Sequence, residues 1–75
     1  MTKYLNLGGN SGVAGYDVGL DAITVYFRDG SAYLYNYGST GIVDVEHMKS
    51  LATAGQGLNS FISRVVGKRY ARKLR

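Results

Sequence analysis

The chain has no cysteine, no proline and no tryptophan among its 75 residues. Without cysteine it can form neither a disulfide nor a thiolate metal site, so only packing supports the fold. A domain this short buries only about 60% of its unfolded surface, so we expect modest stability. The lack of cysteine also fits the cytoplasm, which is the location that we expect.

Long apolar runs are absent as well. No stretch approaches the ~20 apolar residues that a spanning helix needs, and the first residues lack the apolar core of a signal peptide. A peripheral membrane role is not expected, because Tyr70 and Leu74 are the only large apolar residues after Gly67. We therefore predict a soluble protein without a membrane partner.

Acidic residues are few throughout the chain, and the cations gather in its second part. Residues 1–41 carry a net charge of −1, whereas residues 42–75 carry +5. The last twelve positions contain no acid and six cations, namely Arg64, Lys68, Arg69, Arg72, Lys73 and Arg75. Such a concentrated cationic end is typical of a segment that binds polyanions.

Glycines punctuate a chain that is otherwise rich in apolar residues. The apolar content of 45%, with seven tyrosines, predicts a packed core. The stretch Gly8–Gly12 lacks the lysine of a phosphate-binding loop and is predicted to be a flexible breaker. We therefore expect a flexible N-terminal arm at 1–11, a folded domain at 12–67 and a basic C-terminal tail at 68–75.

Hydrophobic periodicity predicts the elements of that domain. Residues 13–18, 22–28 and 31–37 have the composition of strands, and Asp29–Gly30 marks the turn of a hairpin. Helical spacing of apolar residues then predicts helices at about 43–53 and 58–66. The predicted fold is α+β: a small three-stranded antiparallel sheet with a β-hairpin core, followed by two short C-terminal helices.

Two geometries of the hairpin turn place the tyrosines on different faces. A two-residue turn puts an exposed aromatic platform on one face, formed by Tyr26, Tyr33, Tyr35 and Tyr37. A type I turn with a bulged glycine moves the register by one residue. The core then receives Tyr33, Tyr35 and Tyr37 beside Ile23, Val25 and Phe27, and the outer face receives Thr24, Tyr26, Ala32, Leu34 and Asn36. The residues alone leave both geometries open.

Several segments resemble the KTSC domain, a short module found at the C-terminus of some lysyl-tRNA synthetases and as stand-alone bacterial proteins. The resemblance spans about residues 12–66. Its parts are Val13–Asp17, the hairpin Ile23–Ser31, the Tyr33-Leu34-Tyr35 motif, Ala52–Gly55, Leu58-Asn59 and Ile62. The resemblance implies core-facing tyrosines, which favours the bulged turn, and its synthetase context implies RNA binding. Tyr33, Tyr35 and Asn59 are its motif residues, and we expect Asn59 to hydrogen-bond the loop backbone around Gly55.

The sequence offers no recognisable catalytic set. Asp44 and the single histidine, His47, would share a helix face, but no third ligand or nucleophile accompanies them. We therefore predict no enzyme activity, no metal and no cofactor.

The leading hypothesis is a small module that binds RNA or another single-stranded nucleic acid. Its predicted contacts are Arg64, Lys68, Arg69, Arg72 and Lys73 on phosphates, and Tyr70 on a base. The alternative is a protein–protein or self-association module that uses Tyr26, Ala32 and Leu34 on the outer sheet face. The sequence gives no oligomeric state.

Overall fold

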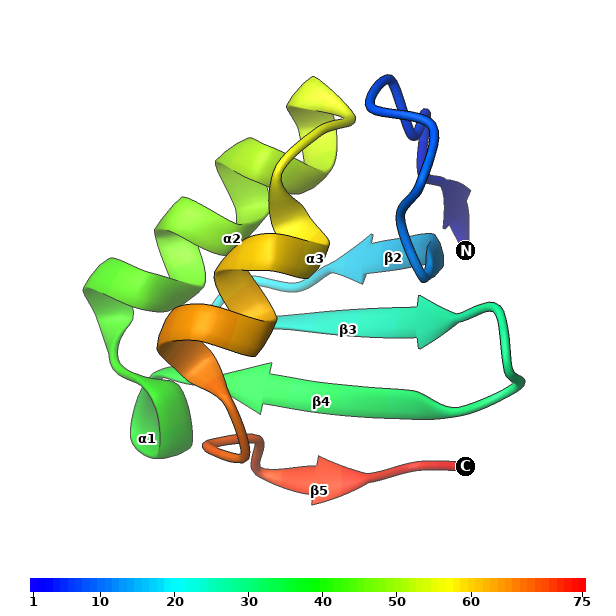
Figure 1. Cartoon of the computed structure of the whole chain (residues 1–75). Coiled ribbons are helices and arrows are strands. Elements are labelled where there is room, and N and C mark those ends of the chain that lie inside the picture. The colour runs from blue at the N-terminus through cyan, green and yellow to red at the C-terminus, as the bar shows by residue number, and fades with distance from the viewer.

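Five antiparallel strands form one sheet in the computed structural model, which describes residues 1–75. The strands are β1 Thr2–Lys3, β2 Val13–Val18, β3 Ala22–Phe27, β4 Ala32–Asn36 and β5 Arg72–Lys73. Each strand pairs with the next one in the chain, so the order across the sheet is β1-β2-β3-β4-β5 (Figure 1). The two ends of the chain therefore form the two opposite edges of the sheet.

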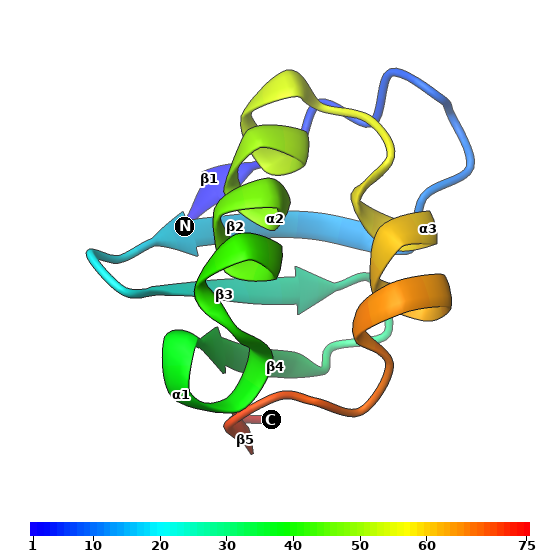
Figure 2. The same ribbon diagram turned by 90° about the vertical axis from the view of Figure 1, so that its left-hand side faces the viewer.

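A helical layer covers one face of this sheet, and the other face carries no helix (Figures 1 and 2). The helices are α1 Tyr37–Thr40, α2 Ile42–Ala54 and α3 Leu58–Phe61, and α3 continues into a π-helical turn, η1 Ile62–Val66. None of these helices has the length and apolar character needed to cross a bilayer.

The prediction of a three-stranded sheet followed by two helices was wrong. The two additional strands, β1 and β5, lie in the segments 1–11 and 68–75 that we had placed outside the folded domain. Each is two residues long, too short to show the alternation by which strands are recognised. Backbone bonds hold β5 in place; the Leu74 N–H, for example, donates to the Ala32 carbonyl at 2.7 Å.

The short helix α1 was also missed, because its sequence is a string of turn-forming residues. The Asn36 side chain caps it by accepting a hydrogen bond from the Ser39 N–H at 2.8 Å. The Ser39 hydroxyl accepts in turn from the Asn36 N–H at 3.3 Å, which completes a capping box. Serine takes here the part that glutamate usually has at this position.

The hairpin uses the bulged turn, so that expectation is confirmed. Tyr26 pairs with Ala32 and Val25 with Tyr33, while Gly30 has a φ of +93°. The left-handed backbone at Gly30 is open to glycine without strain. Tyr33 and Tyr35 consequently face the helical layer and not solvent on the outer face. The third expected tyrosine, Tyr37, lies outside the strand and begins α1.

The core lies between the sheet and α2, α3 and η1. Tyr35 lies in this core and is only 2% exposed, and Tyr4 from the segment 1–11 is 3% exposed. The hydroxyl of Tyr4 accepts a hydrogen bond from the Leu58 N–H at 3.3 Å. The other fully buried large residues are Val13, Ile23, Val25, Val45, Met48, Leu58 and Val66. The N-terminal segment thus contributes a core side chain to this small domain.

Candidate nucleic-acid interface

Residues 64–75, the cationic C-terminal segment, run from the helical layer to the edge of the sheet. Gly67 ends η1 with a φ of +55°, and the chain then turns down toward β4 (Figure 1). The Ala71 N–H donates to the Leu34 carbonyl at 2.7 Å, just before β5 begins. Arg64 therefore lies on η1, Lys68 and Arg69 on a bonded connection, and Arg72 and Lys73 on a paired strand.

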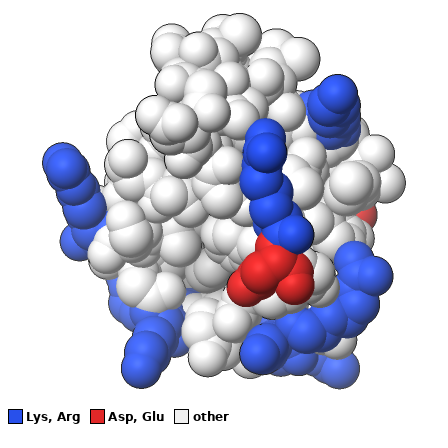
Figure 3. Space-filling model, turned by 45° about the vertical axis from the view of Figure 1, so that its right-hand side comes forward, with Lys and Arg blue, Asp and Glu red and all other residues white.

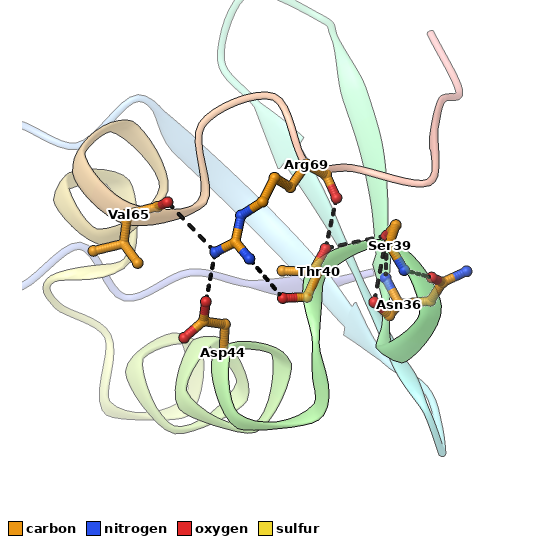
Figure 4. Close-up of polar contacts among 6 residues, drawn as sticks. All are labelled: Asn36, Ser39, Thr40, Asp44, Val65 and Arg69. Carbon is orange, nitrogen blue, oxygen red and sulfur yellow. Dashed lines mark hydrogen bonds and ion pairs between the residues drawn. The ribbon is translucent and has the colours of Figure 1, made fainter.

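Arg69 is a structural residue. Its guanidinium forms an ion pair with Asp44 on α2 and donates to the Thr40 carbonyl at 3.0 Å (Figure 4). It also approaches the Val65 carbonyl at 3.4 Å. The Thr40 hydroxyl donates back to the Arg69 carbonyl at 2.8 Å. Of the six predicted contact residues, Arg69 is thus committed to joining η1, α2 and the C-terminal segment.

Tyr70 is likewise engaged within the protein. Its ring lies 4.7 Å from that of Tyr33 and 6.3 Å from that of Tyr35, measured between centroids. Burial raises the pKa of Tyr35 to about 12, with smaller contributions from Tyr33 and Tyr70. The predicted base-stacking residue therefore anchors the C-terminal segment to the core, and the two motif tyrosines are its partners.

Five other cations of the segment remain without an acidic partner. None forms an ion pair or donates a side-chain hydrogen bond; they are Arg64, Lys68, Arg72, Lys73 and Arg75. Lys73 Nζ lies 5.8 Å from the centroid of the Tyr33 ring, and Arg75 Cζ lies 5.5 Å from that of Tyr26. Arg75 was absent from the predicted set. Lys and Arg side chains predominate over acidic ones on the molecular face that includes the hairpin end (Figure 3).

The strand pairing divides the edge cations between the two faces of the sheet. Arg72 pairs with Leu34, whose side chain points to the outer face, and Lys73 pairs with Tyr33, which faces the helices. Arg75 stacks over Tyr26 on the outer face. The free cations thus surround one edge of the domain and do not form a single flat patch.

An open hollow of about 450 Å³ lies at the hairpin end of the sheet, beside Lys73. Its lining residues are Gly12, Phe27, Arg28, Asp29, Ser31 and Tyr33. The rings of Phe27 and Tyr33 are half-buried and meet edge to face at 5.8 Å. The lining of the hollow therefore combines aromatic surface with Arg28 and Asp29, and Lys73 lies near its Tyr33 ring. Neither Phe27 nor Arg28 was among the predicted site residues.

The one acid in this hollow is already occupied. Asp29 accepts from the Ser31 hydroxyl at 2.6 Å and from the Ser31 N–H at 2.9 Å. These bonds, with a smaller contribution from Lys73, lower the pKa of Asp29 below its ordinary value. The Asp29 carboxylate thus stabilises the turn through Ser31. It forms no ion pair with Arg28 or Lys73.

Asn59, the third motif residue, lies away from these cations. It is half-buried and forms no side-chain hydrogen bond, so the expected bond to the loop around Gly55 is not made. Its Oδ1 instead lies 3.4 Å from the position that a side-chain carbon on residue 12 would occupy. Gly12 lines the hollow, whereas Asn59 does not.

The remaining candidate groups have structural partners. Asp44 pairs with Arg69 and not with His47, whose ring packs against Phe61 at 4.4 Å. No group of three or more histidine, aspartate and glutamate side chains is close enough to hold a metal ion. On the outer sheet face, Ala32 is fully buried and the Tyr26 hydroxyl donates to Asp17 at 2.6 Å. Tyr26 and Leu34 are half-buried, so only part of the apolar surface that suggested a protein-binding face is exposed there.

No protein-family model, curated protein or solved structure matches this chain.

Proposed function

We propose that this protein is a non-enzymatic cytoplasmic module that binds single-stranded nucleic acid, with RNA as its target. The observation that carries the proposal is a set of five unpaired cations in residues 64–75 on an ordered segment. Phosphates would contact Arg64, Lys68, Arg72, Lys73 and Arg75. Arg69 and Tyr70, which we first counted as contacts, hold this segment in place.

Ordering of the cations favours binding. Lys73 and Arg72 sit on a strand whose backbone is already fixed by β4, so binding RNA costs less conformational entropy than ordering a free tail. Neither forms an ion pair, and the Asp29 carboxylate near Lys73 already accepts two hydrogen bonds from Ser31. Neutralising several phosphates releases counterions from the nucleic acid, which is the main source of affinity in such complexes.

The hollow beside Lys73 favours a single strand over a duplex. Phe27 and Tyr33 present ring surface on which an unpaired base can stack, at about 1–3 kcal/mol for each base. Bases of a duplex are stacked on one another and cannot reach such a hollow. The resemblance to KTSC domains belongs to the same proposal, since its synthetase context implies RNA.

Fluorescence anisotropy with a short labelled oligouridine tests the proposal. If about four cations contact phosphates, the logarithm of the binding constant should fall with the logarithm of salt concentration at a slope of about −3. The double variant Arg72→Gln/Lys73→Gln should reduce that slope by roughly half. Lys3→Gln on the opposite edge of the sheet is the control, because the Lys3 side chain is also exposed and forms no ion pair.

Three results would contradict the proposal. They are an absence of binding in dilute buffer, an affinity that does not change with salt, and an equal loss in the Lys3→Gln control. Deleting residues 68–75 is a poor test, because it would also remove β5 and Tyr70 from the sheet and core.

A further inference from the structure

A second pocket, lined almost entirely by neutral polar residues, lies where the loop between β1 and β2 meets the connection between α2 and α3. Its volume is about 200 Å³. Its polar side chains are Asn6, Asn10, Ser11, Gln56, Asn59 and Ser60, and Tyr4 is its one apolar lining residue. In Figure 1 the two contributing segments lie at the top, beyond the β1–β2 edge of the sheet.

The loop that forms one wall is held in a defined shape. Asn6 adopts a left-handed φ of +55°, and its side-chain oxygen accepts a hydrogen bond from the Ser11 N–H at 3.1 Å. Its carbonyl accepts from the Gly9 N–H at 3.0 Å. The Leu7 N–H donates to the Gly55 carbonyl at 2.7 Å, which ties this wall to the opposite one. The pocket is therefore preformed by the protein's own bonds.

Most hydrogen-bonding groups in the pocket have no partner within the protein. The side chains of Asn10, Gln56, Asn59 and Ser60 make no hydrogen bond, and the Asn6 amide nitrogen is also free. Asn59 is half-buried, so its amide is partly withdrawn from solvent. Asn10, Gln56 and Ser60 are exposed, so the pocket is open to solvent and its amide and hydroxyl groups are available to a hydrogen-bonding ligand.

The chemistry of the lining excludes several ligand classes. No lysine or arginine lines the pocket, so a phosphate would find no charged partner there. A lipid would find only one apolar residue. The volume lies below the roughly 300–1,000 Å³ of pockets for drug-sized ligands, so the ligand group is about one ring in size. Asparagine and glutamine amides match the donor–acceptor edges of nucleobases.

The position of the pocket connects it to the RNA surface. Gly12 lines the aromatic hollow, its neighbour Ser11 lines the polar pocket, and Asn59 Oδ1 lies close to the bare Cα of Gly12. No side chain on Gly12 separates the two spaces. On the helical side, Arg64 follows Ser60 by four residues, about one helical turn.

We propose that this pocket binds one unpaired nucleobase through the amides of Asn10, Gln56 and Asn59, next to the base stacked on Phe27 and Tyr33. This inference rests on the proposed function only in taking RNA as the source of the base. The pocket supplies base preference, whereas the cations of residues 64–75 supply affinity that does not depend on sequence.

Neutral nucleosides test the pocket separately from the cations, because they carry no phosphate. Each of the four ribonucleosides is titrated to millimolar concentration into the intact protein while proton–nitrogen NMR spectra are recorded. We expect one nucleoside to shift the side-chain amide signals of Asn59 and Gln56 more than the others do. Asn59→Ala and Asn10→Ala should each reduce that shift at least several-fold. Neither side chain makes a bond within the protein, so both variants should fold.

Ser50→Ala is the matched control, since Ser50 is exposed on α2 outside the pocket. The inference is overturned if no nucleoside shifts the pocket signals, if Asn59→Ala responds like the intact protein, or if N-acetylglucosamine shifts them in place of nucleosides. If oligouridine fails to bind but a nucleoside shifts the pocket, the proposed function fails and the pocket assignment survives. If oligouridine binds but no nucleoside shifts the pocket signals, the pocket assignment fails and the proposed function survives.

Discussion

Arg69 and Asp44 form the one ion pair that joins the C-terminal segment to the helical layer, with 2.5 Å between Nη2 and Oδ2. The same guanidinium reaches the carbonyls of Thr40 and Val65. One side chain therefore connects α1, α2, η1 and the approach to β5. Arg69, which was predicted to contact RNA, thus makes structural contacts within the protein.

Replacing this arginine should affect stability more than binding. We expect Arg69→Ala to lower the free energy of unfolding by about 1–2 kcal/mol, because two carbonyls and a carboxylate lose a charged donor that is about half exposed. Urea denaturation followed by circular dichroism measures the change. Arg64→Ala, which removes an exposed cation without a partner, should leave stability within about 0.5 kcal/mol and weaken RNA binding. The opposite pattern would refute this division of roles.

The face of the sheet used for stacking can be identified with two tyrosine variants. Tyr33→Leu keeps an apolar side chain beside the hollow but removes the ring, so it should weaken oligouridine binding by about 1 kcal/mol or more. Tyr26→Leu removes the ring beneath Arg75 on the outer face and should weaken binding less than Tyr33→Leu does, because it affects a phosphate contact and not the stacked base. A greater loss in the Tyr26 variant would place the bound strand on the outer face.

Gly55 is required where α2 ends. Its φ is +79°, and a side-chain carbon there would lie 2.6 Å from Cβ of Leu5. We expect Gly55→Ala to destabilise the fold by about 2 kcal/mol or more, through left-handed strain and displacement of the N-terminal segment. Thermal denaturation is the measurement. Gly8→Ala is the control, because no atom lies within 4 Å of the added carbon and its φ is not left-handed. Equal losses in both variants would contradict this account.

Buried Tyr35 should make the protein sensitive to alkali. Its pKa is about 12 in the folded protein against 10.0 ordinarily, so the unfolded chain ionises first as the pH rises. The stability is therefore intact below pH 10 and declines between pH 10 and 12, by up to about 1.4 kcal/mol for each pH unit.

Tyr35→Phe should flatten this decline, because the ionisable group is gone. The variant should match the intact protein at pH 7, since the hydroxyl donates no hydrogen bond within the protein. Tyr26 and Tyr37 also have raised pKa values, each through a hydrogen bond to a carboxylate, so some alkaline loss should remain. Denaturation curves at a series of pH values test the difference; identical profiles would exclude Tyr35 as the source.

The long elements of this fold could be predicted from sequence, and the short ones could not. Val25 and Tyr33 lie in strands with clear alternation, and the register of the hairpin followed from the bulged turn. The strands β1 and β5 have two residues each, and tertiary contacts alone define them. Tyr4 and Tyr70 were therefore excluded from the core, although they pack on residues distant in sequence.

The positive charge of the candidate site could be predicted from the sequence, but the arrangement of its residues could not. The cations of residues 64–75 were evident from composition, yet the partner of Arg69 lies 25 residues away on α2. The hollow needs Gly12, Phe27 and Tyr33 from three strand ends, and the polar pocket needs two loops brought together by Tyr4 and Gly55. Nothing local in the sequence signals such convergence.

The last strand has a protective consequence. While Arg72 and Lys73 are paired with Leu34 and Tyr33, the five-residue strand β4 presents no free backbone to another molecule. A chain shortened by a few residues at its carboxyl end would expose that row of amides and carbonyls beside two tyrosines. Copies lacking the final strand should then pair through β4 and aggregate more readily than the intact chain does.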